Sequence, residues 1–131
     1  MIFFQIPSPD LSTLALGGAT LRLLESYGFS ADENYLLVRA TYTDDADTSY
    51  GLNYGFFIYD VQDRAYVSNL NAQIVGVDNA RDVDVVSAQI VGNSSNLTTI
   101  ALVQTKGSET MRLTSMINGQ VVSSDLIAEL T

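Results

Sequence analysis

The stretch from Tyr35 to Asp60 reads YLLVRATYTDDADTSYGLNYGFFIYD, and it decides how the chain folds. Two apolar runs, rich in aromatic and β-branched residues, flank a polar segment that holds three aspartates within four residues. Such apolar runs favour strands, and a polar segment with Gly, Ser and Asp between them favours a turn. The stretch therefore predicts two neighbouring antiparallel strands joined by an acidic loop.

Short apolar runs between Gly, Asn, Asp and Ser clusters recur along the rest of the chain, whereas helical periodicity is nearly absent. The one candidate helix, residues 11–25, is interrupted by two adjacent glycines. The dipeptide Asn118-Gly119 is the strongest signal for a two-residue hairpin, because both positions tolerate positive φ. Eight strands are predicted: Thr20–Tyr27, Tyr35–Thr43, Tyr54–Val61, Ala65–Leu70, Val83–Val91, Leu97–Thr105, Thr110–Ile117 and Gln120–Ile127.

The two sets of four strands can be aligned with each other. Anchored on a shared Gly-x-Ser pattern, YLLVRA at 35–40 aligns with TIALVQ at 99–104. Further along, Val61 aligns with Ile117, at a separation that is shorter by eight positions. This difference falls on the segment 43–53. The acidic loop is therefore predicted to be an insertion relative to its internal copy.

Apolar runs without strict alternation indicate sheets that are covered on both faces. Four-stranded meanders stacked around an axis form a β-propeller, and a two-sheet β-sandwich is the alternative. The prediction is an all-β chain of two four-stranded antiparallel, propeller-like blades within a larger closed propeller or oligomer. Its parts are an N-terminal segment 1–19 with an outer or docking strand in MIFFQI, a first blade 20–80 with the inserted loop 43–53, and a second blade 81–131.

FSADENYLLV at 29–38 and YGFFIYDVQDRAYVSNL at 54–70 resemble a blade of the TolB, prolyl-oligopeptidase and dipeptidyl-peptidase group of propellers. Blades of that group carry a Phe-Ser-Pro-Asp-Gly turn before a hydrophobic strand, and a Tyr-Asp pair ends the third strand. Here the turn has Ala and Glu in place of Pro and Gly, and the pair is Tyr59-Asp60. The clear resemblance is confined to the first blade, and the second blade keeps only its hydrophobic skeleton.

The resemblance also implies a position for the acidic loop. In propellers of this group, the loop between the second and third strands opens on the same face as the connection between blades, where partners are commonly bound. VDNARDVD at 77–84 would form that connection. Tyr50, between Ser49 and Gly51, is the best candidate for an exposed aromatic residue that stacks on a sugar. The residues expected to bind a ligand or partner are Asp44, Asp45, Asp47, Tyr50, Asp78 and Asp82.

Calcium is the one metal that the loop could hold. Asp45, Asp47 and Ser49 supply oxygens at alternate positions, as calcium loops do. Gly51 comes one place late for such a loop, and Phe56 stands where the bidentate Glu would be. A solvated acidic loop without metal is the alternative, and no other cofactor is expected.

Composition removes several classes of function. The chain has 131 residues, 15 acidic and 6 basic, for a net charge of −9, so nucleic acid and anionic membranes are disfavoured as partners. It contains no Cys, His or Trp, which excludes a conventional zinc site and a His-dependent nucleophile. The N-terminus is too short for a spanning helix and poor as a signal peptide, so no membrane insertion is expected.

The function expected is a non-enzymatic module for protein interaction or structural assembly, with no catalytic residues. Two blades are too few for a closed propeller, so its partners would be copies of itself or other chains that supply the remaining blades. Three copies would give six blades, as in some small bacterial and fungal lectins. One alternative is a homo-oligomeric, lectin-like carbohydrate binder, and another is a propeller segment that gates a hydrolase domain outside this chain. A secreted or bacterial cell-surface location is favoured over the cytoplasm.

Overall fold

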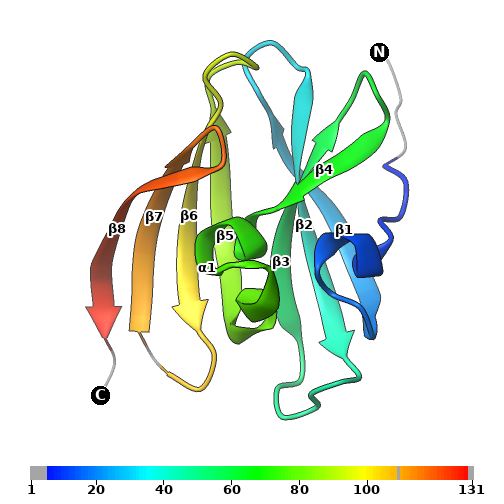
Figure 1. Ribbon diagram of the computed structural model, residues 1–131, viewed down its shortest axis with the longest axis vertical. Helices are drawn as coiled ribbons and strands as arrows, with labels where there is room; N and C mark the ends of the chain where they lie inside the picture. The colour runs from blue at the N-terminus through cyan, green and yellow to red at the C-terminus, as the bar shows by residue number, and fades with distance from the viewer. Residues whose placement is uncertain (1–5, 109, 130–131) are drawn as a thin grey trace.

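The computed structural model describes residues 6–108 and 110–129, which form two four-stranded antiparallel sheets (Figure 1). Each sheet is a meander in which strands that follow one another in sequence are neighbours. The all-β prediction and all eight predicted strands are confirmed. The first sheet holds β1 (Ala19–Phe29), β2 (Tyr35–Asp44), β3 (Asn53–Asp60) and β4 (Ala65–Asn69). The second holds β5 (Val83–Val91), β6 (Thr98–Thr105), β7 (Thr110–Ile117) and β8 (Gln120–Glu129).

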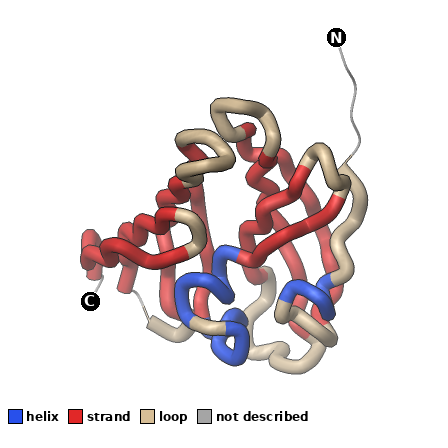
Figure 2. Tube along the Cα trace, turned by 45° about the horizontal axis from the view of Figure 1, so that its top comes forward, coloured by secondary structure: helices blue, strands red, loops and turns tan. Residues whose placement is uncertain are grey.

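Short helical segments precede each sheet. The 3-10 helix η1 (Leu11–Leu14) comes before β1, while α1 (Leu70–Val75) and the 3-10 helix η2 (Val77–Asp82) connect β4 to β5. The sequence analysis did not predict α1 or η2. Figure 2 shows the helical segments beside the stacked strands, and α1 contacts β3 and β4 on one side and β5 and β8 on the other. The outer strand predicted for residues 1–6 lies outside the described residues, except for Ile6.

One face of the first sheet packs against the second sheet. We call this the front face of the first sheet, and it carries Leu37, Phe56 and Ile58, all almost fully buried. Leu70, the first residue of α1, packs into the same core. The residues of the second sheet in this core are Val83, Val85, Ile90, Ala101, Val103 and Met116.

The opposite face of the first sheet, its back face, is covered by the chain before β1. Three buried leucines of the segment 6–18 pack on it: Leu11, Leu14 and Leu16. The back-face residues beneath this segment and its neighbours are Leu36, Val38, Ala40, Tyr42, Phe57 and Tyr59. Both faces of β2 and β3 are therefore buried, which explains why these strands read as continuous apolar runs.

Backbone hydrogen bonds fix which faces of the two sheets correspond. In an antiparallel pair every second residue directs its N–H and C=O toward a given neighbour, and L-chirality then fixes the face on which its side chain stands. Val61 N donates to Asn34 O at 3.0 Å, and Asn118 N donates to Leu97 O at 2.8 Å. The first bond lies one residue beyond the paired residues of β2 and β3, and the second lies one residue beyond those of β6 and β7. Neither pairing contains a register shift, so the pair β2–β3 can be superimposed on the pair β6–β7 by these bonds.

This superposition assigns the faces of the second sheet. Leu36 corresponds to Thr99 and Leu37 to Ile100, so the back face of the second sheet carries Thr99, Ala101 and Val103. Ala101 and Val103 belong to the core that also contains Leu37. The two sheets therefore stack front to back, because the front face of the first sheet contacts the back face of the second. The front face of the second sheet carries Ile100, Leu102 and Leu113 and points away from the first sheet.

The sequence alignment of the two halves was wrong by one position. The hydrogen bonds match Asn34 with Leu97 and Val61 with Asn118, whereas the sequence alignment matched Val61 with Ile117. The inserted loop is therefore six residues longer than its counterpart, not eight. The error came from matching Gly28 with Gly92, because Gly28 pairs with Leu37 inside β1 whereas Gly92 lies in the turn after β5.

The turns after β1 and β5 are tied to each other by a carboxylate. Asp32 accepts hydrogen bonds from Ser94 N at 2.8 Å, from the Ser94 hydroxyl at 2.6 Å and from the Ser30 hydroxyl at 2.7 Å. A backbone bond from Ala31 N to Gly92 O at 2.8 Å lies beside them. The Ser94 hydroxyl, followed by that of Ser30, lowers the pKa of Asp32 well below its usual range.

We expect Asp32→Ala and Ser94→Ala each to lower the urea midpoint of unfolding. The double variant should lose little more than the larger single loss, because both changes remove the same bonds. Because the folded-state pKa of Asp32 is lowered, its stabilisation is present above the ordinary pKa of aspartate and is lost as pH falls through the folded value. Asp63→Ala, in the exposed turn after β3, is the control. Fully additive losses in the double variant would contradict this account.

Candidate functional site

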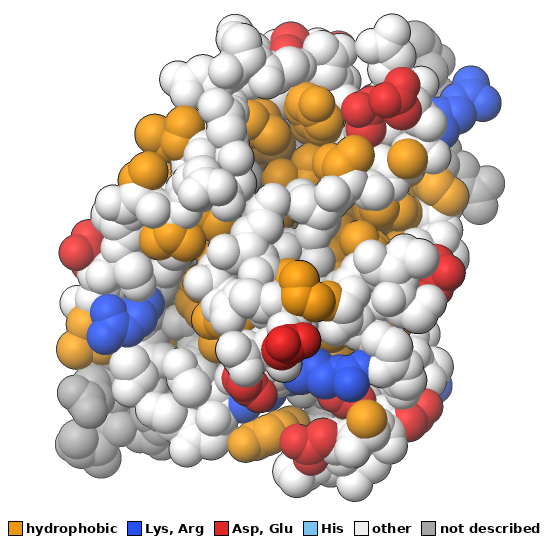
Figure 3. Space-filling view, in the orientation of Figure 1, with side chains coloured by type: hydrophobic (Ala, Val, Ile, Leu, Met, Phe, Trp, Pro, Cys, Tyr) orange, Lys and Arg blue, Asp and Glu red, His pale blue; other side chains and the backbone are white. Residues whose placement is uncertain are grey.

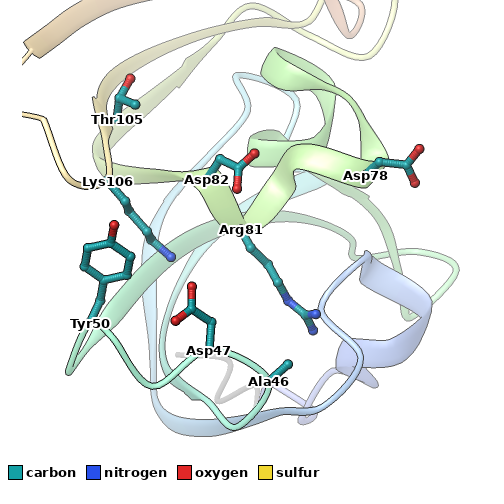
Figure 4. A pocket seen from close by; sticks show the side chains of 8 residues that line it. All are labelled: Ala46, Asp47, Tyr50, Asp78, Arg81, Asp82, Thr105 and Lys106. Atoms are coloured by element: carbon teal, nitrogen blue, oxygen red, sulfur yellow. The ribbon is translucent and has the colours of Figure 1, made fainter.

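An open pocket of about 420 Å³ lies at the end of the molecule where the β2–β3 loop meets η2 and the end of β6 (Figure 4). It brings together four of the six residues that the sequence analysis expected to bind a ligand or partner. The lining residues are Ala46, Asp47, Tyr50, Asp78, Arg81, Asp82, Thr105 and Lys106. Figure 3 shows acidic and basic side chains gathered near this end of the molecule.

Asp44 has a structural role beneath this end, although it was expected on the surface. Its carboxylate is buried, and Oδ2 lies 3.2 Å from Arg81 Nε in an ion pair. Oδ1 accepts a hydrogen bond from Ala46 N at 3.0 Å, which fixes the first turn of the loop. Arg81 Nη2 is buried and has no hydrogen-bond acceptor among the described residues. The ion pair joins the first sheet to η2.

Lys106 and Asp84 form the second charged pair. The Lys106 side chain is only 5% exposed, and its Nζ lies 3.7 Å from Asp84 Oδ1. Asp84 Oδ1 also accepts a hydrogen bond from Tyr54 N at 2.9 Å, so a carboxylate of β5 binds the backbone at the start of β3. The Lys106 Nζ also lies 5.5 Å from the centre of the Tyr42 ring and 5.9 Å from that of Tyr50.

Burial dominates the protonation of this pair. It lowers the pKa of Lys106, although the carboxylates of Asp84, Asp44 and Asp47 act in the opposite direction. Burial also raises the pKa of Asp84, against the hydrogen bond from Tyr54 N and the charge of Lys106. Both shifts disfavour the charged forms, so desolvation costs this pair more than its mutual attraction returns.

The acidic loop is held by its own short contacts. Asp45 Oδ2 accepts from the Thr20 hydroxyl at 3.0 Å, and Asp47 Oδ1 accepts from Ser49 N at 3.0 Å. The hydroxyl and the N–H of Ser49 lower the pKa of Asp47. Tyr50 is 38% exposed and borders the pocket beside Lys106. The loop thus folds back over the end of the second sheet.

These contacts bear on the calcium hypothesis. The Asp45 carboxylate bonds to Thr20 in β1, and the Asp47 carboxylate bonds within the loop. Among the described residues, no three Asp, Glu, His or Cys side chains are grouped so that they could hold a metal ion. Calcium binding through Asp45, Asp47 and Ser49 stays a prediction.

Sequence reasoning missed the two cations of the pocket, Arg81 and Lys106. With the corrected alignment of β2 on β6, Lys106 corresponds to Thr43 at the start of the acidic loop, so it could have been placed at this end of the molecule. Its burial could not be found that way, because it depends on the neighbouring sheet. In Figure 4 the Lys106 side chain extends toward the loop residue Asp47, the Arg81 side chain extends away from it, and Asp78 and Asp82 stand on η2.

The arrangement is suited to binding. Arg81 and Lys106 are already paired with Asp44 and Asp84, so their charges are balanced within the protein. The carboxylates at the mouth can accept hydrogen bonds from hydroxyl or ammonium groups, and the Tyr50 ring offers a flat apolar surface beside them.

Comparisons with known proteins add no relative. No protein-family model, curated protein or solved structure matches the chain. In the described part of the chain, none of the helices has the length and hydropathy needed to cross a bilayer.

We expect Lys106→Met to lower the free energy of unfolding by roughly 2–3 kcal/mol, because it leaves Asp84 buried without a cation. The double variant Asp84→Asn/Lys106→Met should return to within about 1 kcal/mol of the wild type, since the uncharged pair no longer carries the cost of desolvating two charges. Urea unfolding measures both values. Equal losses in the single and the double variant would contradict the account.

The same pair gives a pH test. Because the folded-state pKa of Asp84 is raised, its contribution to stability is greatest below the unfolded-state pKa and is lost as pH rises through the folded value. On acidification from pH 7 toward pH 3, the wild type should therefore gain stability relative to Asp84→Asn.

Proposed function

We propose that the protein is a non-enzymatic protein-interaction module whose two sheets are consecutive propeller-like blades of a larger assembly. The observation that carries the proposal is the apolar centre of the front face of the second sheet, formed by Ile100, Leu102 and Leu113, which the other described elements leave partly exposed. Leu113, at its centre, is 39% exposed.

The counterpart of this face shows what such a surface accepts. Leu37 and Phe56, on the front face of the first sheet, correspond to Ile100 and Leu113 on the second. The first pair is fully buried by the neighbouring sheet, whereas the second pair is not. A third sheet that stacked in the same way would cover Ile100, Leu102 and Leu113.

Front-to-back stacking favours blades over a sandwich. In a sandwich of two related sheets with equivalent inner faces, both apolar faces are used up and the outer faces are polar. Here the first sheet uses its front face for the contact and the second sheet uses its back face. The front face of the second sheet, with its apolar centre, therefore takes no part in the contact. Successive sheets that each present a front and a back are the arrangement found around a propeller axis.

Photocrosslinking in cells that make the protein tests this function. With p-benzoylphenylalanine in place of Leu113, we expect a crosslink to a protein whose attached peptide is identified by mass spectrometry. The same group in place of Val77, which is 68% exposed on η2, is the control and should give no such product. Absence of any crosslink specific to position 113 would overturn the proposal.

Carbohydrate binding is the second candidate function, and the pocket beside Tyr50 favours it. An exposed aromatic ring next to the carboxylates of Asp47, Asp78 and Asp82 matches the chemistry of a sugar site, where a ring face stacks and acidic oxygens accept hydroxyl protons.

A glycan array tests the second candidate. We expect binding of a defined glycan class that is lost in Tyr50→Ala and kept in Tyr27→Ala, since Tyr27 is similarly exposed but lies on β1 away from the pocket. Silence across the array, or equal loss in both variants, would exclude this role.

A further inference from the structure

We propose that β8 pairs antiparallel with the β8 of a second copy of this chain, centred on Ser124, so that the second sheets of two copies form one continuous sheet. This inference goes beyond the proposed function, because it uses the edge of the second sheet and leaves its front face free. It follows from the exposure of β8 and from the order of its side chains.

β8 is an edge strand of the second sheet in the part of the chain that the structure describes. The strand order is β5-β6-β7-β8, and β8 is hydrogen-bonded to β7 alone. Every residue from Gln120 to Ile127 is exposed. Along such an edge, every second residue directs its N–H and C=O away from the sheet, where another strand can pair with them. β8 therefore offers a row of backbone donors and acceptors to an added strand.

The edge formed by β8 lacks the features that usually protect an edge strand. Proteins commonly keep such strands short or place Lys or Pro on them. β4, the corresponding strand of the first sheet, has five residues and ends where α1 begins. β8 has ten residues, and its stretch 120–127 contains no Lys, Arg or Pro. The first sheet thus has a short edge at this position, and the second has a long edge that is open to pairing.

The side chains of β8 are ordered symmetrically about Ser124. Two apolar residues precede the polar stretch Ser123–Asp125, and two apolar residues follow it. These four side chains are 44–56% exposed: Val121, Val122, Leu126 and Ile127. An apolar, polar, apolar order of this kind reads alike in both directions of the strand.

This order makes β8 complementary to itself. In an antiparallel pair centred on Ser124, Val122 lies opposite Leu126 of the second copy. Val121 lies opposite Ile127 in the same way, so apolar side chains meet on both faces of the joined sheet. Opposite residues in this register differ by an even number, so both direct their N–H and C=O alike and can bond to each other.

The regular part of β8 lies at the centre of this contact. The pairing with β7 runs without a shift from Ser123 to Leu126, and it passes over Val122 and Ile127. The two irregular positions therefore lie toward the ends of the contact. The backbone around Ser124 is the regular extended strand that strand addition requires.

The contact is symmetric and closes at two copies. Each copy uses the same strand, so a two-fold axis through the Ser124 pair relates the copies. This axis is perpendicular to the joined sheet, which places the front faces of both copies on the same side. Leu113 therefore stays accessible to a partner of the front face.

Sedimentation equilibrium measures the association. With a chain mass of 14.2 kDa, the wild type should approach twice that mass as its concentration rises and return to one chain on dilution. A wild type that stays at 14.2 kDa up to its solubility limit would overturn the proposal, even where β8 takes up an extended peptide of a different protein.

A single cysteine at the centre tests the register. The chain contains no cysteine, so Ser124→Cys introduces the only thiol. In the proposed pair the two thiols lie directly opposite each other, with Cα atoms about 4.5–5.5 Å apart, a distance that a disulfide can bridge. Mild oxidation should therefore convert most of this variant into a covalent dimer on a non-reducing gel.

Asp125→Cys is the matched control, one residue away on the same exposed strand. Its two thiols would lie diagonally across the contact, with Cα atoms about 7–8 Å apart, beyond the reach of an unstrained disulfide. We expect its covalent dimer to form at least about tenfold more slowly than that of Ser124→Cys. Equal rates, or a faster rate for Asp125→Cys, would show that β8 does not pair in this register.

Charge at position 123 gives an independent measurement. In the proposed pair Ser123 lies opposite Asp125 of the second copy, and within its own chain it lies opposite the uncharged Ser115. Ser123→Asp places two like-charge pairs in the dimer and should raise its Kd roughly tenfold, whereas Ser123→Lys places two opposite-charge pairs and should lower the Kd.

The same two changes at Val77, which is 68% exposed on η2 outside the contact, are the control for the altered net charge. Val77→Asp and Val77→Lys should shift the Kd much less than the changes at position 123. Equal shifts at the two positions would mean that the copies associate through a different surface, and the proposal would be wrong.

Discussion

A β-sheet that is apolar on both faces is stable in water only when both faces are covered, and the rest of this structure depends on that constraint. The first sheet meets it within the chain, with the second sheet on its front and the segment 6–18 on its back. The second sheet meets it on one face only. Among the described residues, the stack is thus covered on both faces of the first sheet, whereas Leu113 on the front face of the second sheet stays 39% exposed.

Polar contacts decide how the two sheets are placed, because apolar contact alone has little directional preference. At one end Asp32 binds Ser94 across the turns that follow β1 and β5. At the other end Asp84 binds Tyr54 N. Each contact joins a carboxylate of one sheet region to a backbone or hydroxyl donor of the other. Polar contacts therefore join the two sheets at both ends of their shared apolar core.

The sequence predicted strands well and their tertiary environment poorly, for physical reasons. Aromatic and β-branched runs bounded by turn residues are local signals, and they led to all eight strands. The helix α1 has six residues, too few for a helical period to show, and its cap Asn69 resembles any polar residue after a strand. Alignment of the two halves failed by one position because a glycine in a strand was matched with a glycine in a turn, and a shift of one exchanges the faces of a sheet. Four acidic or aromatic pocket residues were predicted together because the resemblance to propeller blades implied that the β2–β3 loop and the connection between the two sheets open on the same face. The depth of Arg81 and Lys106 is a product of packing and has no such signal.

The burial of Lys106 has a practical consequence for the chemistry of the surface. Lys106 is the only lysine in the sequence, and its amino group lies against Asp84 beneath the Tyr50 ring. An amine-directed reagent can reach it only when the loop over it opens. The rate of acylation of Lys106 therefore measures how often the β2–β3 loop moves away from the second sheet, without any label having to be introduced.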